Sequence, residues 1–138
     1  MSPGENGFTF HHVGVACTDI TTEAVQFGTL GYVAEGEPFE DPIQGIRGLF
    51  MAGQSPRVEL LEPISTDSSG VLTPWLASGI KLYHLAYCVP QLAAAIDAMR
   101  ARRGKLVVAP VPAVAFGGRR IAFVMLPNRL LIELISSE

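Results

Sequence analysis

The feature that most constrains the fold is an internal repeat that spans nearly the whole chain. The stretch FHHVGVACTDITTEAVQF from Phe10 matches LYHLAYCVPQLAAAIDAM from Leu82, and GIRGLFMAGQSPRVELLEP from Gly45 matches GRRIAFVMLPNRLLIELIS from Gly118. In each copy an apolar strand with an internal histidine leads into a helix, and a later strand carries a glutamate. A chain that repeats one supersecondary unit is expected to build two similar modules.

Each half is predicted to contain one strand, one helix and three further strands, which gives an α+β fold of two tandem βαβββ modules. The first half has expected strands near 8–17, 31–37, 45–52 and 56–62, with a helix near 20–30. The second half has expected strands near 82–89, 104–109, 118–126 and 129–136, with a helix near 90–103. We expect modules at residues 1–66 and 81–138, joined by a linker at 67–80, within one structural domain. The two modules are expected to form a half-open curved sheet.

Several residues have the chemistry of helix ends. Asp19 is expected to cap the first helix through its side-chain oxygen, and Pro90 suits the first turn of the second helix, where a missing N–H costs little. Gly31 and Gly104 follow the two helices, where a left-handed cap favours glycine. The stretch VLTPWLASG is predicted to form a short helical bridge, with Trp75 anchoring it.

The composition excludes several classes of protein. An apolar fraction of 49% supports a folded core, and a net charge of −3 offers no basic surface for nucleic acid. The two cysteines argue against a disulfide framework. The N-terminal stretch MSPGENGFTF lacks the features of a signal peptide, and no apolar run is long enough to span a membrane. We therefore expect a cytoplasmic protein with no membrane partner. Phosphate-binding glycine motifs are absent, so no nucleotide cofactor is expected.

Four residues recur at matched places in the two copies: His12 with Glu59, and His84 with Glu133. A single buried histidine is more often a hydrogen-bonded core residue than a metal ligand, and a single glutamate can lie at a strand end. Recurrence of both residue types in both copies favours a metal site. Two imidazoles and two carboxylates suit a divalent ion such as Zn²⁺, Mn²⁺, Co²⁺, Ni²⁺ or Fe²⁺. We predict that the four side chains converge in a central metal cup. His11 points to the opposite strand face and is interpreted as a packing or surface residue.

The words FHHVGVACTDI, QGIRGLFM, RVELLEP, YHLAYCV and LLIELI resemble the vicinal oxygen chelate superfamily, which includes glyoxalase I, bleomycin resistance proteins and dioxygenases. Within it, the chain is most similar to the methylmalonyl-CoA epimerase branch. The resemblance implies paired βαβββ modules, a divalent metal bound by His12, Glu59, His84 and Glu133, and a substrate that chelates the metal through adjacent oxygens. It also implies an epimerase or isomerase that acts through a metal-stabilised enolate of a small acyl thioester, such as an acyl-CoA.

The sequence departs from this branch at two places. A glutamate interpreted as a catalytic base often stands on the strand after QG, where this chain has Gly48, and the turn before the strand at 118–126 reads AFGG. Glu133 is therefore the candidate catalytic base. The candidate substrate-binding residues are an amide, two cations and a glycine-containing lip: Gln44, Arg47, Arg120, Phe116 and Gly117. For either arginine alone, a solvent-facing position is the simpler interpretation.

Two other functions stay open. One is a different metal-dependent enzyme of the same scaffold, either a glyoxalase-type lyase or an Fe(II) dioxygenase, although the fourth ligand Glu59 argues against the dioxygenase. The other is a non-catalytic, resistance-type protein that binds a small molecule, which the altered residue at Gly48 favours. Family members occur as dimers and as monomers, and we favour a homodimer.

Overall fold

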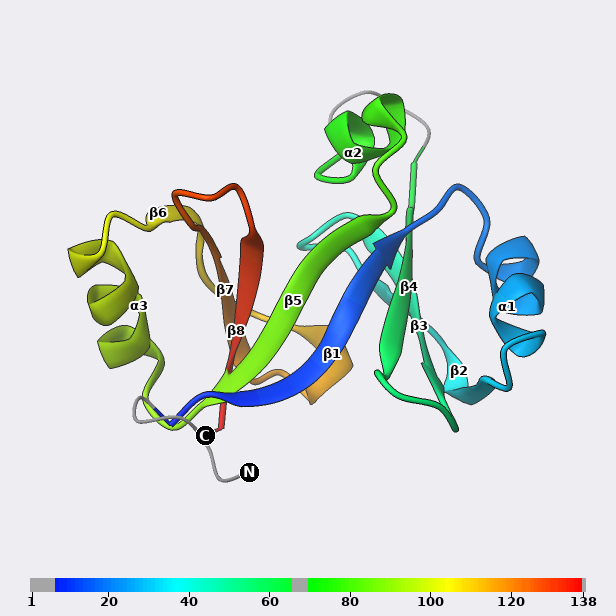
Figure 1. Ribbon diagram of the computed structural model, residues 1–138, viewed down its shortest axis with the longest axis horizontal. Helices are drawn as coiled ribbons and strands as arrows, with labels where there is room; N and C mark the ends of the chain where they lie inside the picture. The colour runs from blue at the N-terminus through cyan, green and yellow to red at the C-terminus, as the bar shows by residue number, and fades with distance from the viewer. Residues whose placement is uncertain (1–6, 66–69, 138) are drawn as a thin grey trace. The chain divides into compact units, whose positions relative to one another are not determined.

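The computed structural model describes residues 7–65 and 70–137, and the chain folds into the strands and helices labelled in Figure 1. The elements of the first half are β1 (Thr9–Ala16), α1 (Ile20–Gly28), β2 (Val33–Asp41), β3 (Ile46–Ala52) and β4 (Val58–Pro63). Those that follow are α2 (Thr73–Ser78), β5 (Leu82–Val89), α3 (Leu92–Ala101), β6 (Lys105–Pro112), the 3₁₀ helix η1 (Val114–Phe116), β7 (Arg120–Met125) and β8 (Leu131–Ser136). The predicted α+β class and the two βαβββ modules are confirmed.

The chain divides into two compact units, which we call the central and the terminal unit. Of the residues that the structure describes, those between His12 and Tyr83 form the central unit, and residues 7–11 and 84–137 form the terminal unit. Both divisions fall inside strands, in β1 and in β5. The predicted module boundaries at 66–67 and 80–81 stay predictions, and residues 66–69 of that linker and 1–6 of the N-terminal stretch lie outside the described residues.

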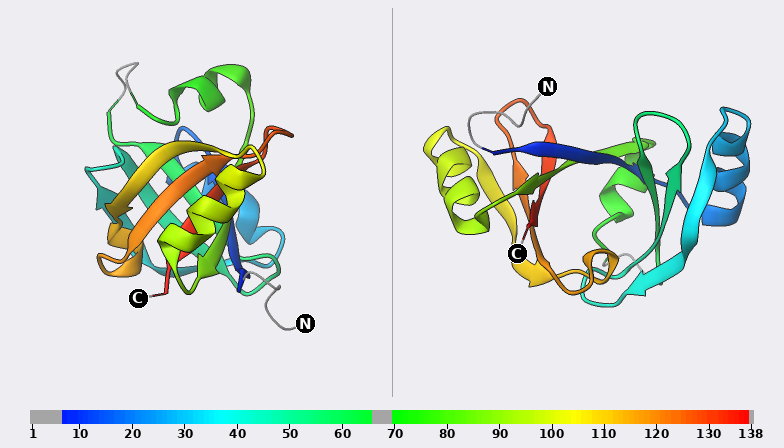
Figure 2. Two further views of the ribbon diagram at one scale, coloured as in Figure 1. Left: turned by 90° about the vertical axis from the view of Figure 1, so that its left-hand side faces the viewer. Right: turned by 90° about the horizontal axis from the view of Figure 1, so that it is seen from below.

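The central unit has the strand order β2-β3-β4-β1, with β1 parallel to β4 and the other neighbours antiparallel. Helix α1 lies against one face of these strands (Figure 2). Apolar side chains from that face and from the helix form one core cluster: Val15, Cys17, Ile20, Tyr32, Leu49, Met51, Val58 and Leu60. Because strand residues alternate between faces, the residues between these point away from α1.

The terminal unit repeats this plan with the strand order β5-β8-β7-β6, in which β5 is parallel to β8. Helix α3 contacts β6, β7 and β8 from one face (Figure 2). The core between them is made of apolar residues: Val89, Leu92, Ala95, Ile96, Ala122, Val124, Ile132 and Leu134. The repeat seen in the sequence therefore corresponds to a repeated strand order, with a helix packed on one face of the strands in each unit.

Strands β2 and β6 both extend further than the sequence predicted. Pro38 and Pro110 argue against a continuous strand, because proline cannot donate to a ladder. The structure accommodates them at irregularities of the pairing, between Glu35 and Phe39 in β2 and between Val108 and Val111 in β6. Each strand is the outer one in its unit, where an unpaired backbone position is tolerated.

The helix ends confirm part of the predicted capping. Asp19 is the N-cap of α1, and its Oδ1 atom accepts a hydrogen bond of 3.1 Å from the N–H of Thr21. The prediction for Pro90 is wrong, because α3 begins at Leu92 with Gln91 as its N-cap. Gly31 has a positive φ, as predicted, with a value of 96°. After α3 the left-handed residue is Arg103, with φ of 71°, and not the predicted Gly104. The predicted bridge is confirmed as α2, where the ring of Trp75 packs edge-on against that of Tyr83 at 5.2 Å.

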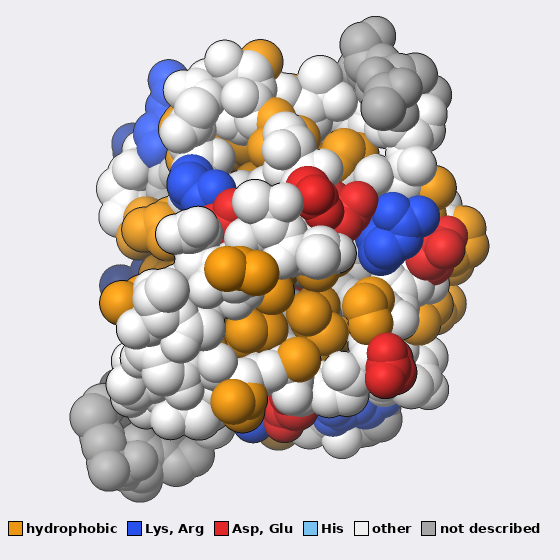
Figure 3. Space-filling model, turned by 90° about the vertical axis from the view of Figure 1, so that its right-hand side faces the viewer, with side chains coloured by type: hydrophobic (Ala, Val, Ile, Leu, Met, Phe, Trp, Pro, Cys, Tyr) orange, Lys and Arg blue, Asp and Glu red, His pale blue; other side chains and the backbone are white. Residues whose placement is uncertain are grey.

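Some apolar side chains remain exposed on the surface. Val25 of α1, Leu30 and Val33 are each more than half exposed. Figure 3 shows a face of the molecule on which hydrophobic side chains gather between acidic and basic ones. Among the described residues, none of the helices has the length and apolar character needed to cross a membrane.

Candidate functional site

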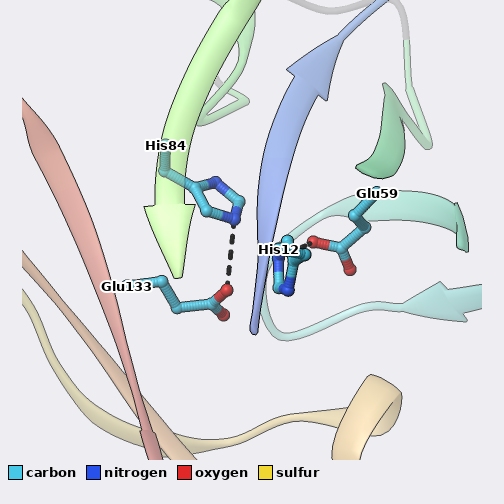
Figure 4. A group of neighbouring side chains, drawn as sticks. All are labelled: His12, Glu59, His84 and Glu133. Atoms are coloured by element: carbon cyan, nitrogen blue, oxygen red, sulfur yellow. Dashed lines mark ion pairs between the residues drawn. The ribbon is translucent and has the colours of Figure 1, made fainter. Parts of the chain in front are cut away.

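The central unit contains a buried pair of His12 and Glu59. Gly14 lies opposite Glu59 in the parallel ladder of β1 and β4, and His12 precedes Gly14 by two residues on the same strand face. The Nε2 atom of His12 is 3.0 Å from Oε1 of Glu59. His12 is 0% and Glu59 4% exposed, so both are withdrawn from solvent. Figure 4 shows the carboxylate of Glu59 turned toward the imidazole.

The terminal unit contains the same arrangement, built from His84 and Glu133. Ala86 lies opposite Glu133 in the parallel ladder of β5 and β8, and His84 precedes Ala86 by two residues. The Nε2 atom of His84 is 3.1 Å from Oε1 of Glu133, as the dashed line in Figure 4 marks. His84 is 5% and Glu133 3% exposed. The structure therefore pairs the predicted ligands within each unit.

An aromatic ring completes each pair. The Phe50 ring meets the His12 ring edge-on, with centroids 5.2 Å apart and planes at 80°, and Phe123 meets His84 with the same distance and angle. Phe50 lies opposite Glu59 in the ladder of β3 and β4, and Phe123 lies opposite Glu133 in the ladder of β7 and β8. Phe123 was not predicted from the sequence, although it occupies the place of Phe50 in the repeat.

The donor chemistry of these residues suits a divalent metal ion. Burying a carboxylate costs free energy unless a hydrogen bond, a charge or a metal compensates it. Each unit offers one imidazole nitrogen and one carboxylate oxygen, which are the donors that ions such as Zn²⁺ and Mn²⁺ prefer. His12, Glu59, His84 and Glu133 are all buried residues that could hold a metal ion.

The face of the central unit that carries Glu59 has an aromatic lining beside the pair. Phe39 lies opposite Gly48 in the ladder of β2 and β3. The rings of Phe39 and Phe50 are stacked, with centroids 6.0 Å apart and planes at 29°. A Cβ atom added to Gly48 would lie 2.9 Å from Cε1 and 3.0 Å from Cε2 of Phe39. The Phe39 ring thus occupies the space into which a side chain at position 48 would extend.

Gln44 lies in the turn between β2 and β3, where Asp41 orients it. Its side-chain Nε2 donates to Oδ2 of Asp41 at 2.9 Å, and its backbone N–H donates to Oδ1 at 3.2 Å. Asp41 is 1% exposed. This buried carboxylate was not among the residues predicted from the sequence. The DPIQG turn held the only signal for it, since Asp often bonds to nearby backbone N–H groups in turns.

Arg47 lies on the strand face opposite to Gly48 and Phe50, since alternate residues point to opposite faces. It forms ion pairs with Glu62 at 3.1 Å and with Glu40 at 3.6 Å. The other carboxylate oxygen of Glu62 accepts the backbone N–H of Ile20 at the start of α1. The structure therefore places Arg47 in an ion-pair cluster on the helix-covered side of the central unit, away from the side of Glu59.

Arg120 also lies on the helix-covered side of its unit. It shares a strand face with Ala122 and Val124 of the α3 core, whereas Phe123 points to the other face. Arg120 lines a cavity of about 230 Å³ beside α3, together with Leu92, Ala93, Ile96, Asp97, Leu106 and Pro110. The structure thus does not bring Arg120 to the face that carries Glu133.

Phe116 and Gly117 belong to the segment after β6. Phe116 ends η1, and Gly117 follows it with a positive φ of 64°. The Phe116 ring packs edge-on against the His11 ring at 5.4 Å, and the guanidinium of Arg119 lies 5.8 Å from the Phe116 centroid. The interpretation of His11 as a packing residue is therefore confirmed.

Comparison with known proteins agrees with this architecture. Residues 11–123 match the family model of the Glyoxalase/Bleomycin resistance protein/Dioxygenase superfamily. The chain belongs to this superfamily. The resemblance found in the sequence is thereby confirmed.

The relatives of this chain in the superfamily include epimerases. An ethylmalonyl-CoA/methylmalonyl-CoA epimerase of Cereibacter sphaeroides is 28% identical over 116 residues, which cover 82% of this chain and 84% of that protein. The structure of methylmalonyl-CoA epimerase from Mycobacterium tuberculosis superposes with a TM-score of 0.78 at 24% identity, over 100% of this chain and 93% of that one. A Streptomyces coelicolor methylmalonyl-CoA epimerase variant in complex with 2-nitronate-propionyl-CoA superposes with a TM-score of 0.74 at 24% identity, over 93% of this chain and 96% of that one. These structures share the fold of this chain.

Proposed function

We propose that this protein is a divalent-metal-dependent epimerase or isomerase that acts on a small acyl thioester, in the manner of methylmalonyl-CoA epimerase. The observation that carries the proposal is the pair of buried His–Glu contacts, at 3.0 and 3.1 Å, built at the same register in both units. The epimerase relatives support the reaction class and the use of a thioester substrate. The superfamily supports the use of a metal.

His12, Glu59, His84 and Glu133 are the proposed ligands of one ion, of Co, Mn, Zn, Ni or Fe. Each unit would supply one imidazole and one carboxylate, and the two carboxylates would balance the charge of a divalent cation. When bound, such an ion is a Lewis acid that stabilises the negative charge of the enolate oxygen formed when the neighbouring C–H bond loses its proton.

Glu133 is the proposed catalytic base. Its carboxylate can accept the proton from carbon 2 of a malonyl thioester, which leaves a planar enolate. A proton delivered to the opposite face of that carbon, from an acid or from solvent, then inverts the stereocentre. Among the described residues, β3 presents no ionisable side chain on the face of Phe50, because its residues there are Ile46, Gly48, Phe50 and Ala52. Gln44 can only donate or accept hydrogen bonds and would orient the substrate, with Asp41 holding its amide group.

A second candidate function is the binding of a chelating small molecule without turnover. The observation that favours it is the packing of Phe39 over Gly48, which leaves β3 without a group for proton transfer. The two functions make opposite predictions for exchange at carbon 2.

The decisive experiment is solvent deuterium incorporation into methylmalonyl-CoA by protein loaded with Mn²⁺ or Co²⁺. We expect exchange at carbon 2 by the wild type and its loss in Glu133→Gln, measured by mass spectrometry. Glu40→Gln is the matched control, because the Glu40 side chain is 58% exposed and lies outside the proposed site. Metal content is measured on each sample. If the metal-loaded wild type binds methylmalonyl-CoA without exchange at carbon 2, the proposed epimerase function is wrong. The second candidate function, binding without turnover, would then be supported.

A further inference from the structure

We infer that Phe39 and Phe50 form a subsite for an apolar substituent of the ligand, and that Phe39 limits the size of that substituent. The inference rests on the proposed function, because it concerns the group on carbon 2 of the acyl thioester. We call Phe39 and Phe50 together the aromatic subsite.

The ladders place the aromatic subsite on the strand face of Glu59. Residues directly opposite each other in an antiparallel ladder share a face. Phe50 lies opposite Glu59, Phe39 lies opposite Gly48, and Gly48 is two residues from Phe50 on β3. All of these positions therefore point to one side of the central unit, away from α1. The edge contact between Phe50 and His12 makes the subsite a direct neighbour of the His–Glu pair.

The position of Phe39 depends on the absence of a side chain at residue 48. Its ring comes so close that a Cβ atom at Gly48 would meet three ring carbons, of which Cζ is the nearest and Cε1 and Cε2 lie at 2.9 and 3.0 Å. Real Cβ contacts are longer than this, so any larger residue at 48 would displace the ring. In return, the ring stacks on Phe50 at a centroid distance of 6.0 Å. Gly48 and Phe39 therefore act as one structural element.

The chemistry of this element is apolar. Both rings are partly exposed, and the β3 residues on the same face are all uncharged. Asp41, which lies opposite Ile46 on this face, is buried and hydrogen-bonded to Gln44. An alkyl group placed on two aromatic rings loses its contact with water, and each buried methylene strengthens binding by about fourfold. The ligand class that this surface recognises is therefore a chelating acyl thioester with an apolar 2-substituent.

The packing part of the inference is tested by a double-mutant cycle on thermal unfolding. We expect Gly48→Ala to destabilise the protein in the wild-type background. The loss should be at least halved in the Phe39→Ala background, because the opposing ring is gone. An equal loss in both backgrounds would show that Phe39 does not restrict position 48. This measurement needs neither metal nor substrate.

The specificity part is tested by equilibrium binding of methylmalonyl-CoA and butylmalonyl-CoA to Mn²⁺-loaded protein, measured by calorimetry. We expect Phe39→Ala to shift the ratio of the two Kd values at least tenfold toward the butyl compound. Val33→Ala, on the exposed part of the same strand, is the matched control and should leave the ratio unchanged. An unchanged ratio in folded Phe39→Ala would overturn the subsite.

The same samples separate this inference from the proposed function. If Phe39→Ala shifts the Kd ratio toward the butyl compound but no deuterium appears at carbon 2, the proposed epimerase function is wrong and the aromatic subsite is supported. If deuterium is incorporated but the Kd ratio is unchanged in Phe39→Ala, the epimerase function is supported and the aromatic subsite is wrong. Failure of the wild type to bind either thioester would overturn both.

Discussion

Glu133 lies opposite Ala86 in the ladder of β5 and β8, and this pairing brings its carboxylate to 3.1 Å from the Nε2 atom of His84. Gly14 plays the part of Ala86 for Glu59 in the central unit. In each unit a small residue, Gly14 or Ala86, lies opposite the glutamate and two residues after the histidine. Its small size leaves room for the histidine and glutamate side chains to meet. The geometry of each pair is thus set by strand register.

The two glutamates are expected to differ in their roles. Glutamine keeps a carbonyl oxygen that can bind a metal, but its amide group cannot take up a proton. We therefore expect Glu59→Gln to retain deuterium exchange within about tenfold of the wild type, whereas Glu133→Gln loses about 10²- to 10⁴-fold. Exchange rates and metal content are measured for both variants. Equal losses in the two would contradict the assignment of Glu133 as the base.

Metal binding should stabilise the folded chain. A ligand at a hundredfold excess over its Kd stabilises a protein by about 2.7 kcal/mol, because it binds only the folded state. We expect Mn²⁺ to raise the Tm of the wild type, and a chelator to reverse the rise. His12→Ala and His84→Ala should each abolish the shift. His11→Ala, on the same strand as His12, should retain it, and loss of the shift in that variant would argue against a specific site.

Two glycines test the local packing with opposite signs. A Cβ atom at Gly104 would lie 2.8 Å from the backbone oxygen of Met99 and 2.9 Å from Cγ1 of Val124, so Gly104→Ala should destabilise by about 1–3 kcal/mol. A Cβ atom at Gly28, in the last turn of α1, would meet nothing within 4 Å. Gly28→Ala should stabilise by up to about 1 kcal/mol. Chemical denaturation gives the free energy of unfolding of both variants. Changes of the same sign would contradict the predicted difference between the two positions.

The cap of α1 should contribute measurably to stability. Asp19 accepts hydrogen bonds from the N–H of Thr21 at 3.1 Å and from the hydroxyl of Thr22 at 2.8 Å. Asp19→Ala should therefore cost about 1 kcal/mol in the free energy of unfolding. Asp97→Ala, an exposed position within α3, serves as the control and should change it by less than about 0.5 kcal/mol.

Cys17 should be inert toward thiol reagents. Burial, reinforced by the nearby carboxylates of Glu23 and Glu62, raises the pKa of its thiol from 9.0 to about 12. At pH 8 only about one molecule in ten thousand then carries the thiolate. Iodoacetamide should modify Cys88, which is partly exposed, well before Cys17. Mass spectrometry of the peptides gives the order, and faster modification of Cys17 would contradict it.

The same shift has a consequence for stability at high pH. Because the folded-state pKa lies above that of the unfolded chain, the folded state binds the thiol proton more tightly. This contribution is fully present below pH 9 and is lost as the pH rises from about 9 to about 12. Cys17→Ala should lack this part of the alkaline loss of stability.

Sequence reasoning succeeded where one local pattern determined the outcome. The alternation of residues and the repeat sufficed to predict β1 and β5 and to single out the histidine and the glutamate at matched places in each copy. Asp19 was predictable as a cap because its side chain bonds within one turn. Pro90 was misplaced by the same kind of reasoning, since proline before a helix and proline in its first turn look alike in a sequence.

The remainder depended on contacts between distant residues. Phe39 and Gly48 lie on different strands. Pro38 within β2 and Pro110 within β6 obscured the length of these two outer strands. Arg47 and Arg120 were singled out for their charge and their matched places in the repeat. Their partners, Glu62 and the lining of the cavity beside α3, became visible only in three dimensions.

The repeated register also has an evolutionary consequence. A chain that carries the same unit twice can change a position in one copy while the corresponding position in the other copy stays as it was. The residue opposite Leu61 on β3 is Gly48, whereas the residue opposite Ile135 on β7 is Ile121. The histidine and glutamate remain in both copies. The two copies thus keep the histidine and the glutamate while the residues beside them differ, so the two halves of one protein can take on different tasks.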